Sequence, residues 1–180
     1  MGESYGSIVS KRPCPIHCVW IPPIQNQIRI ACDGSSRGNP GLEGAGFVAR
    51  DYKGQVVAAH VVGMGITTNF VGEICAIICG LEWAKDAGIN NVWIVSDSKP
   101  AINCILKNKV PWFLRPRWEN LLNYIPQRNF SHVHREINFG ADQMARKGAT
   151  LARGHRLAFD SRPIWLRVES QNVIYYRFKL

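Results

Sequence analysis

Two acidic residues stand at the ends of short apolar runs, where many α/β proteins place their functional groups. Asp33 closes the run in "IRIACD" and precedes a segment of Gly, Ser, Asn and Pro. Asp97 closes the run in "VWIVSD" and is followed by Ser98. Because functional groups of open α/β sheets gather where strands end and helices begin, we expect both carboxylates at one edge of a sheet. Asp33 alone has a simpler interpretation, as a turn residue that caps its own loop.

Two further acids follow a different pattern, since each lies four residues after an asparagine. Glu73 follows Asn69 in "NFVGE", and Asp142 follows Asn138 in "NFGAD". Asparagine is a good N-cap, so each acid is predicted to lie in the first turn of a helix. One such acid alone is more typical of a helix-dipole partner than of a ligand. The repeated placement of all four acids favours a shared site.

Four converging carboxylates repel one another strongly, and the chain has only 13 acidic residues in all. Hard divalent cations with oxygen ligands supply the missing counter-charge. Two Mg²⁺ ions held about 4 Å apart activate a water on one side of a phosphodiester and stabilise the leaving oxygen on the other. We therefore predict two Mg²⁺ ions, with Mn²⁺ as a substitute, and phosphodiester hydrolysis as the reaction.

Hydrophobic periodicity indicates the elements that position these acids. Three strands come first and are predicted to form an antiparallel meander, with the tight turn of "DYKG" between the second and the third. A helix follows, ended by Gly88, and then a nearly continuous apolar strand typical of a buried central position. Two short helices, a last strand and a last helix complete the pattern. The expected strands are 27–33, 44–51, 55–64, 91–97 and 130–134, and the expected helices are 70–88, 99–107, 117–125 and one from about 140.

The predicted fold is an α/β domain with a mixed five-stranded sheet, a three-stranded antiparallel meander plus two further strands, flanked by helices. At 180 residues the chain is long enough for one core and short for two. Residues 1–25 contain four prolines without sustained periodicity and are predicted to form an extended N-terminal arm. The domain itself is expected over 26–151, followed by a C-terminal tail over 152–180 that lacks a clear pattern.

The chain is basic, with 22 Lys and Arg against 13 Asp and Glu and a formal charge of +9. This excess suits a polyanionic partner, although solubility alone also accounts for it. The sequence contains neither a signal peptide nor an apolar run long enough to span a membrane, so an intracellular protein, nuclear or cytoplasmic, is predicted. We expect a monomer.

Six cysteines raise the question of disulfides or metal binding. Four of them lie within apolar stretches, where Cys behaves as a small buried hydrophobe, so a reducing compartment is favoured. Cys14, His17 and Cys18 in "CPIHC" offer a zinc site as an alternative. No second Cys/His pair of suitable spacing follows them, which disfavours that alternative.

The segments "DGSSRGNPG", "TTNFVGE", "SDSK" and "HVHREINFGAD", in this order, resemble the motifs of type 1 ribonuclease H. The chain is most similar to the ribonuclease H-like domains of plant non-LTR retroelements and their stand-alone relatives. The resemblance implies the ribonuclease H-like fold and a pair of metal ions held by Asp33, Glu73, Asp97 and Asp142. It also implies an RNA/DNA hybrid as the nucleic-acid partner, with hydrolysis of the RNA strand.

The glycine- and serine-rich segment after Asp33 fits such a substrate independently of the resemblance. Small residues let backbone N–H groups approach a nucleic-acid strand, and polar side chains there reach the wide minor groove where the 2′-hydroxyls lie. Without Asp33 beside it, a plain hairpin connection would be the preferred interpretation. The predicted nucleic-acid contacts are Gly34, Ser35, Ser36, Asn39, Thr68, Asn69, Lys99 and Arg135.

Many members of the resembled family place a flexible histidine before the last acid, where it helps proton transfer or product release. The alternation of "FSHVH" puts His132 inside the last strand. His134, or Arg135 at the exit of that strand, is therefore the predicted stand-in. A structural role is the ordinary alternative for both histidines.

Three departures from the family pattern bear on activity. Phe70 stands where members often carry a second asparagine, and Lys99 stands where many carry a polar amide. The long basic handle of some bacterial members is absent, and "KNKVPWFLRPRW" occupies its place. We expect Trp112 and Trp118 of this region to be core residues. The departures leave two alternatives open, a catalytically weak or inactive nucleic-acid-binding module derived from a retroelement, and a retroelement remnant without a cellular role.

Overall fold

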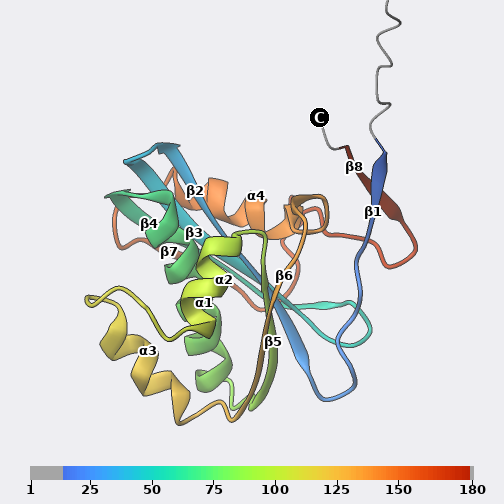
Figure 1. Cartoon of the computed structure of the whole chain (residues 1–180), viewed down its shortest axis with the longest axis horizontal. Coiled ribbons are helices and arrows are strands. Elements are labelled where there is room, and N and C mark those ends of the chain that lie inside the picture. Colours follow the sequence, from blue (N-terminus) through green and yellow to red (C-terminus); the bar gives the residue numbers. More distant parts are fainter. Residues whose placement is uncertain (1–13, 179–180) are drawn as a thin grey trace, which may run out of the picture.

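The computed structural model of the chain describes residues 14–178 and shows a central sheet with helices on both faces (Figure 1). The strands of this part are β1 (Pro15–Val19), β2 (Ile28–Gly38), β3 (Gly41–Arg50), β4 (Val56–Thr67), β5 (Asn91–Ser96), β6 (Gln127–His132), β7 (Arg156–Phe159) and β8 (Ile174–Phe178). The helices are α1 (Asn69–Asp86), α2 (Lys99–Leu106), α3 (Arg115–Leu122) and α4 (Phe139–Gly148), with a short 3-10 helix η1 (Arg135–Ile137).

Six of the strands form one mixed sheet in the order β6-β5-β2-β3-β4-β7. β2, β3 and β4 are antiparallel neighbours, β5 is parallel to β2, and β6 is parallel to β5. The five predicted strands and their arrangement are therefore confirmed, and β7 extends the sheet beyond β4. β7 consists of the four residues "RLAF", which are too few for an alternation that the sequence would reveal.

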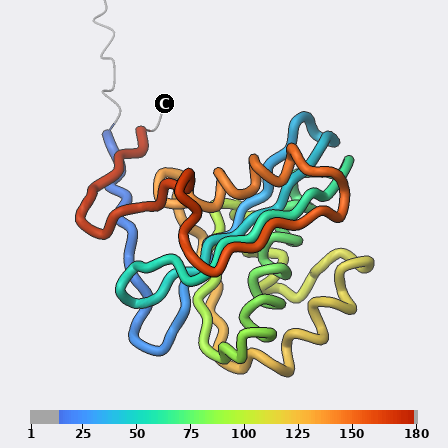
Figure 2. The backbone as a smooth tube through the Cα atoms, turned by 180° about the vertical axis from the view of Figure 1, so that it is seen from behind, coloured from blue at the N-terminus to red at the C-terminus, as the bar shows by residue number. Residues whose placement is uncertain are grey.

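α1 and α4 pack on opposite faces of the central strands, as the view from behind also shows (Figure 2). Consecutive residues of β3 face different helices, because side chains alternate along a strand. The ring of Phe47 lies 5.8 Å from that of Trp83 in α1, whereas a Cβ at Gly46 would lie 2.5 Å from the Met144 side chain of α4. The missing side chain at Gly46 thus lets α4 approach the sheet closely.

The helix predicted over 70–88 is α1, and its apolar residues form the centre of the main core. Ile74, Ile78 and Leu81 are each at most 1% exposed. Each such side chain stabilises the fold by about 1.5 to 3 kcal/mol when it leaves water. Gly88 follows the helix with a φ of 70°, the left-handed conformation expected at a helix end.

The two tryptophans predicted to be core residues have different environments. Trp118 of α3 is confirmed, since it is 3% exposed and its indole nitrogen donates to Asn108 Oδ1 at 2.7 Å. The prediction for Trp112 is wrong, because this side chain is 83% exposed. The turn that precedes α3 directs Leu114 into the core in its place, with an exposure of 6%.

The segment that follows Asp33 is a strand rather than a loop, so the predicted strand end at 33 is wrong. Residues 34–38 continue β2 and pair with β3, and Ser36 stands opposite Glu43. The hairpin turns at Asn39 and Pro40, which are joined by a cis peptide bond. The polar composition of this segment alone predicts a loop. Pairing with β3 satisfies its backbone hydrogen bonds and makes it a strand.

β1 and β8 bring the two described ends of the chain together in a small antiparallel sheet beside the main one (Figure 1). Next to β1, Trp20 is 1% exposed and the Arg50 guanidinium lies 3.7 Å from its ring centre. Arg50 in turn pairs with Glu169 at 3.4 Å, and both side chains are buried. The division into arm, domain and tail stays a prediction, although both outer parts carry strands that the sequence does not indicate.

All six cysteines are free thiols, and four of them are buried. Within residues 14–178, the only group of three or more His, Cys, Asp or Glu side chains arranged to hold a metal ion is an acidic one. The "CPIHC" segment therefore offers no zinc site in that part of the chain. In the same described residues, no helix combines the length and the apolar character needed to cross a membrane.

Candidate active site

The predicted acids gather at one edge of the sheet because β2 is longer than its neighbour β5. The pairing of these two strands ends with Cys32 opposite Ser96, so the rest of β2 has no described strand on that side. Asp33 and Asp97 directly follow this last pair and are thereby brought together. The first turns of α1 lie over the same gap and add Glu73.

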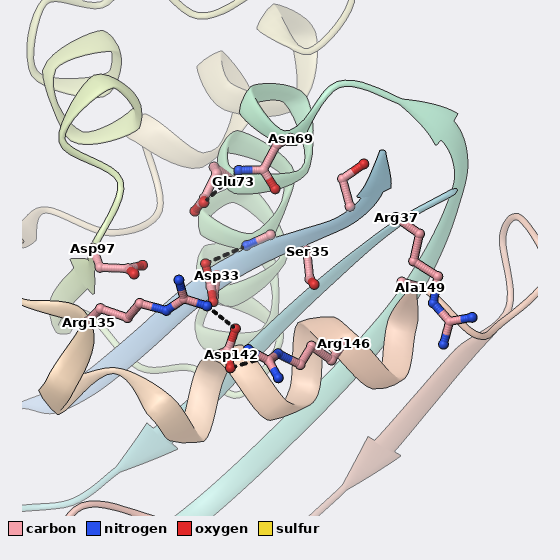
Figure 3. Close-up of a pocket in the computed structure, with 12 residues that line it drawn as sticks. Asp33, Ser35, Arg37, Asn69, Glu73, Asp97, Arg135, Asp142, Arg146 and Ala149 are labelled. Carbon is pink, nitrogen blue, oxygen red and sulfur yellow. Dashed lines mark hydrogen bonds and ion pairs between the residues drawn. The ribbon is translucent and has the colours of Figure 1, made fainter. Parts of the chain in front are cut away.

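Asp33, Glu73 and Asp97 form a compact group, called here the acidic triad. One carboxylate oxygen of each lies within 4.8 Å of those of the other two. The three side chains point into one cavity of about 570 Å³ (Figure 3). Asp33 and Glu73 are each only 5% exposed. Carboxylate oxygens at this separation can share a bound cation.

Glu73 is held by hydrogen bonds from two directions. Asn69, one helical turn earlier, donates through Nδ2 to Glu73 Oε1 at 3.3 Å, and Ser96 donates through Oγ to Oε2 at 3.4 Å. Gly34 makes this arrangement possible, since a Cβ at that position would lie 2.6 Å from the backbone nitrogen of Glu73. The glycine of "DGSS" therefore allows α1 to approach β2.

Asn138 holds the other side of the acidic triad. Its side-chain nitrogen donates to Asp97 Oδ1 and to the Cys32 carbonyl oxygen, each at 3.1 Å. Asn138 is 1% exposed and so connects β2, the end of β5 and the start of α4 from within the protein. Asp33 Oδ1 accepts a hydrogen bond from the backbone N–H of Gly34 at 2.9 Å. These bonds orient the carboxylates before a ligand binds.

The acidic triad carries a large electrostatic cost when its carboxylates are ionised without a cation. Burial raises the pKa of Asp33 well above its usual range, and the charges of Glu73 and Asp97 raise it further. Burial, followed by the charge of Asp97, likewise raises the pKa of Glu73. A divalent cation opposes both effects because it favours the ionised forms. In spacing and in chemistry, the residues fit a hard cation.

Asp142 lines the same cavity but has a different environment. It lies in the first turn of α4, as predicted. Its Oδ2 is 2.9 Å from Nε of Arg146, and its Oδ1 is 3.6 Å from Nη2 of Arg135 (Figure 3). The Asp142 side chain is 16% exposed, whereas those of Arg135 and Arg146 are 63% and 61% exposed. The fourth acid therefore has counter-charges supplied by the protein.

The caps of the two helices differ from the prediction. Thr68 rather than Asn69 caps α1, since its hydroxyl accepts a backbone N–H of the first turn at 3.4 Å. Glu73 consequently lies in the second turn of α1 and not in the first. Asn138 does precede α4, but its side-chain oxygen accepts no capping bond, and its side-chain nitrogen donates to Asp97. Threonine and asparagine both serve as N-caps, so "TTN" leaves the choice open.

Five of the eight residues predicted to contact nucleic acid line the cavity, namely Gly34, Ser35, Ser36, Asn69 and Arg135. The other three lie outside its lining. Thr68 caps α1, and Asn39 accepts the backbone N–H of Asn69 at 3.3 Å, so both hold the local backbone. Lys99 is the first residue of α2 and is exposed.

His134 follows β6 and lines a neighbouring cavity that also includes Asp97. His132 lies in β6, as predicted, but it is the last residue of the strand, which was expected to continue to 134. The two histidine rings are 5.9 Å apart. A role of His134 in proton transfer or product release stays a prediction.

Three residues at the site were not indicated by the sequence. Arg37 and Arg146 line the cavity, and Glu43 lies buried beside the first turns of α1. Burial raises the pKa of Glu43 to about 7. The spacing of Asp142 and Arg146, four residues apart on a helix, is a usable signal for an ion pair. Arg37 has no such signal, because its segment is predicted to be a loop.

Comparisons with known proteins find relatives of this chain. A family model described as reverse transcriptase-like matches residues 31–148. A ribonuclease H protein of Arabidopsis thaliana is 28% identical over 156 residues, which make up 80% of this chain and 24% of that protein. Ribonuclease HI of Halobacterium salinarum is 30% identical over 143 residues, or 74% of this chain and 69% of that one. The chain thus spans a minor part of the plant relative.

Solved structures of ribonuclease H1 proteins share the fold. That of the Halobacterium protein superposes with a TM-score of 0.62 at 29% identity and covers 68% of this chain and 96% of that one. LC11 ribonuclease H1, isolated from compost and solved in complex with an RNA/DNA hybrid, gives a TM-score of 0.60 at 29% identity, with coverage of 68% and 96%. The predicted fold class is confirmed.

Proposed function

The chain belongs to the ribonuclease H family, and from this premise we propose that it is a metal-dependent endonuclease that hydrolyses the RNA strand of RNA/DNA hybrids. The observation that carries the proposal is the acidic triad, whose carboxylate oxygens converge within 4.8 Å at a partly open cavity. The hybrid in the LC11 ribonuclease H1 structure supports the choice of substrate. The chain matches 24% of the length of the plant relative, so we propose this activity for the chain alone and not for that whole protein.

We assign the acidic triad and Asp142 as the residues that hold two Mg²⁺ ions, with Mn²⁺ as a substitute. Bound there, the ions would supply a water of lowered pKa and stabilise negative charge on the leaving oxygen. Ionised carboxylates are the ligands that such hard cations prefer. The hydrogen bonds from Asn69, Ser96 and Asn138 keep three of these carboxylate oxygens in place, so little reorganisation is needed when a cation binds.

The residues around the acidic triad would bind the hybrid. Arg135 and Arg146 present largely exposed guanidinium groups beside the cavity, and these groups suit backbone phosphates. Gly34 and Ser35 line the cavity with little side-chain bulk, which leaves room for a strand to lie against β2. The Ser35 hydroxyl and the Asn69 amide, which also line the cavity, can form hydrogen bonds with the 2′-hydroxyls of the minor groove.

The proposal is tested by incubating purified protein with a hybrid labelled on either strand, with Mg²⁺ and then with Mn²⁺. We expect the RNA strand alone to be cut, and Asp97→Asn to abolish cutting. Single-stranded RNA and duplex DNA serve as control substrates. A folded protein that leaves the hybrid intact with both metals would contradict the proposal.

A nucleic-acid-binding module with weak or no activity is the second candidate, and it rests on two observations. Asp142 is paired with two arginines that cations would have to displace. Phe70, beside Asn69, is 38% exposed and offers no hydrogen bond to a base or sugar. Binding of the hybrid with a steep salt dependence but no turnover would favour this candidate.

We further infer a plant retroelement origin. The match to the Arabidopsis relative over 80% of this chain supports this origin. The genomic sequence around the gene tests the inference, since a reverse transcriptase reading frame directly upstream is expected. An isolated gene with flanking sequences typical of a cellular locus would contradict it.

We also propose a monomer located in the nucleus or cytoplasm. Light scattering coupled to size-exclusion chromatography should give a mass near the 20.2 kDa of one chain. Fluorescence microscopy of a tagged chain tests the location, and accumulation in a secretory compartment would contradict it.

A further inference from the structure

A second cavity of about 380 Å³ borders Asp97 on the side away from β2. Its lining combines residues near the active site with residues of the small terminal sheet. His132 ends β6, Arg135 begins η1, and His134 lies between these two elements. Ile16 comes from β1 and Arg177 from β8. The last two lie outside the segment that matches the family model, residues 31–148. The terminal sheet therefore forms one wall of a cavity beside the acidic triad.

The pairing of β1 with β8 places Arg177 in this wall. Ile16 stands opposite Arg177, and the alternation of β8 makes Arg177 and Tyr175 half-buried, whereas Tyr176 and Phe178 are exposed. Nη1 of Arg177 lies 3.6 Å from Glu136 Oε2, longer than a hydrogen bond. The guanidinium side chain is 43% exposed. Arg177 is thus held near the cavity without a strong partner for its charge.

We propose that this cavity is a binding subsite for a backbone phosphate of the RNA strand, next to the phosphate that is cut, with Arg177 as its principal ligand. A guanidinium group offers a planar fork of donors that matches the oxygens of a phosphate. Arg135 and the two histidines add further donors around the same space. The inference rests on the proposed function, because it takes the acidic triad to be where the strand is cut.

Asp97 connects the two cavities, since it lines both. A strand whose scissile phosphate lies at the acidic triad therefore has an adjoining space for its neighbouring phosphate. Two carboxylates also face or flank this space, Asp97 and Glu136, and they oppose an anion. Cations bound to Asp97 would offset its negative charge. Glu136 is only weakly paired with Arg177, so the arginine remains available to a phosphate.

The binding test uses a Glu73→Gln chain, which should bind a hybrid without cutting it and does not alter the second cavity. In that background, Arg177→Ala should weaken binding of a fluorescent hybrid about fivefold and lower the salt slope by about 1, the change expected for one phosphate contact. Arg177→Lys should weaken binding of the hybrid less than Arg177→Ala, because lysine keeps the positive charge. Arg167→Ala removes an exposed arginine from the same C-terminal region and should bind like the parent. Circular dichroism melting checks that each variant is folded.

A second arm locates the contact along the strand. Each RNA phosphate is replaced in turn with an uncharged methylphosphonate, and binding to the parent and to Arg177→Ala is compared. We expect one position beside the scissile phosphate to weaken the parent and to leave Arg177→Ala unchanged. No position with this behaviour, or equal binding by Arg177→Ala and Arg167→Ala, would overturn the subsite even if the protein cuts hybrids. Binding that depends on Arg177 at one position supports the subsite even if the wild-type chain fails to cut.

Discussion

The acidic triad and Asp142 line one cavity, yet they differ in the charge of the groups that surround them. The triad receives its hydrogen bonds from neutral groups, and two of its members, Asp33 and Glu73, are buried and have pKa values raised by that burial. Asp142 is more exposed than these two and already has Arg135 and Arg146 beside it. The triad thus depends on a cation from solution, whereas Asp142 would have to exchange one positive partner for another.

This difference gives the two parts of the site different tasks. A preorganised triad with unbalanced charge binds the first cation at little reorganisation cost. An acid with exposed arginine partners is better suited to hold a cation only when the substrate is present, since phosphates can bind the arginines in its place. Variants that remove one acid at a time test whether the two regions differ as described.

The largest effect is expected from Asp33→Asn. Cleavage should fall about 1000-fold, because the loss of a triad ligand removes several kcal/mol of metal-dependent stabilisation. In EDTA, the melting temperature should rise by about 3 °C, which corresponds to about 1 kcal/mol for a chain of this size. The reason is that a neutral amide, unlike the buried Asp33 carboxyl with its raised pKa, does not have to take up a proton when the chain folds. A gel assay and circular dichroism melting measure the two effects. Asp160→Asn, at an exposed position, is the control, and a lower melting temperature for Asp33→Asn in EDTA would contradict the account of the triad.

A smaller effect is expected from Asp142→Asn. Cleavage should fall about 10- to 100-fold and recover in part at higher Mg²⁺ concentration, because the triad remains intact. In EDTA, the melting temperature should decrease slightly, since an arginine pair worth about 0.3 to 0.5 kcal/mol is lost. Opposite signs for Asp33→Asn and Asp142→Asn in the same melting experiment are the expected result. Equal increases would mean that the two regions do not differ.

The pH dependence of stability provides a third test. The folded chain without metal keeps a proton on Glu73, whose pKa is raised to about 8, whereas the unfolded chain releases it near pH 4. The stabilisation is therefore present below about pH 4 and is lost as the pH rises through about 8. We expect the melting temperature in EDTA to fall from pH 5 to pH 9. Mg²⁺ should remove most of this slope, and so should Glu73→Gln; a slope unchanged by either would contradict the account.

The smallest effect is expected from Arg146→Ala. Removing this partner frees Asp142, and Mn²⁺ should bind about twofold more tightly, in proportion to an ion pair of about 0.3 to 0.5 kcal/mol. Isothermal titration calorimetry measures the affinity. Lys147→Ala removes the neighbouring exposed charge, which is five residues from Asp142 and not at ion-pair spacing on the helix, and should change the affinity less. Weaker Mn²⁺ binding by Arg146→Ala would show that the arginine supports the metal site.

The features predicted correctly from the sequence have local signals. Asp33 and Asp97 follow apolar runs, and Asp142 lies in a first helical turn, so strand and helix patterns are enough to place them. α1 and its apolar face follow from helical spacing alone. The four motifs from "DGSSRGNPG" to "HVHREINFGAD", in their order along the chain, indicate the family. These signals indicate which acids lie near one another, but they do not indicate the hydrogen-bond and ion-pair partners of those acids.

The features that were missed depend on contacts between distant segments. Residues 34–38 form a strand only because β3 pairs with them. Trp112 is a local exception, since it is exposed while Leu114, two residues later, is buried. Neither β1 nor β8 has a strong pattern of its own, and each is ordered against the other. The two arginines beside Asp142 distinguish it from the triad, and only the spacing of Arg146 hints at this in the sequence.

The pairing of Pro15 with Phe178 has a consequence for how this unit can be joined to other proteins. Polypeptide attached before β1 and polypeptide attached after β8 would depart from one corner of the molecule. That corner adjoins Asp97 through Ile16 and Arg177. A fusion partner joined to either strand would therefore be tethered on this side of the molecule, near the active site, where it could deliver or block the nucleic acid.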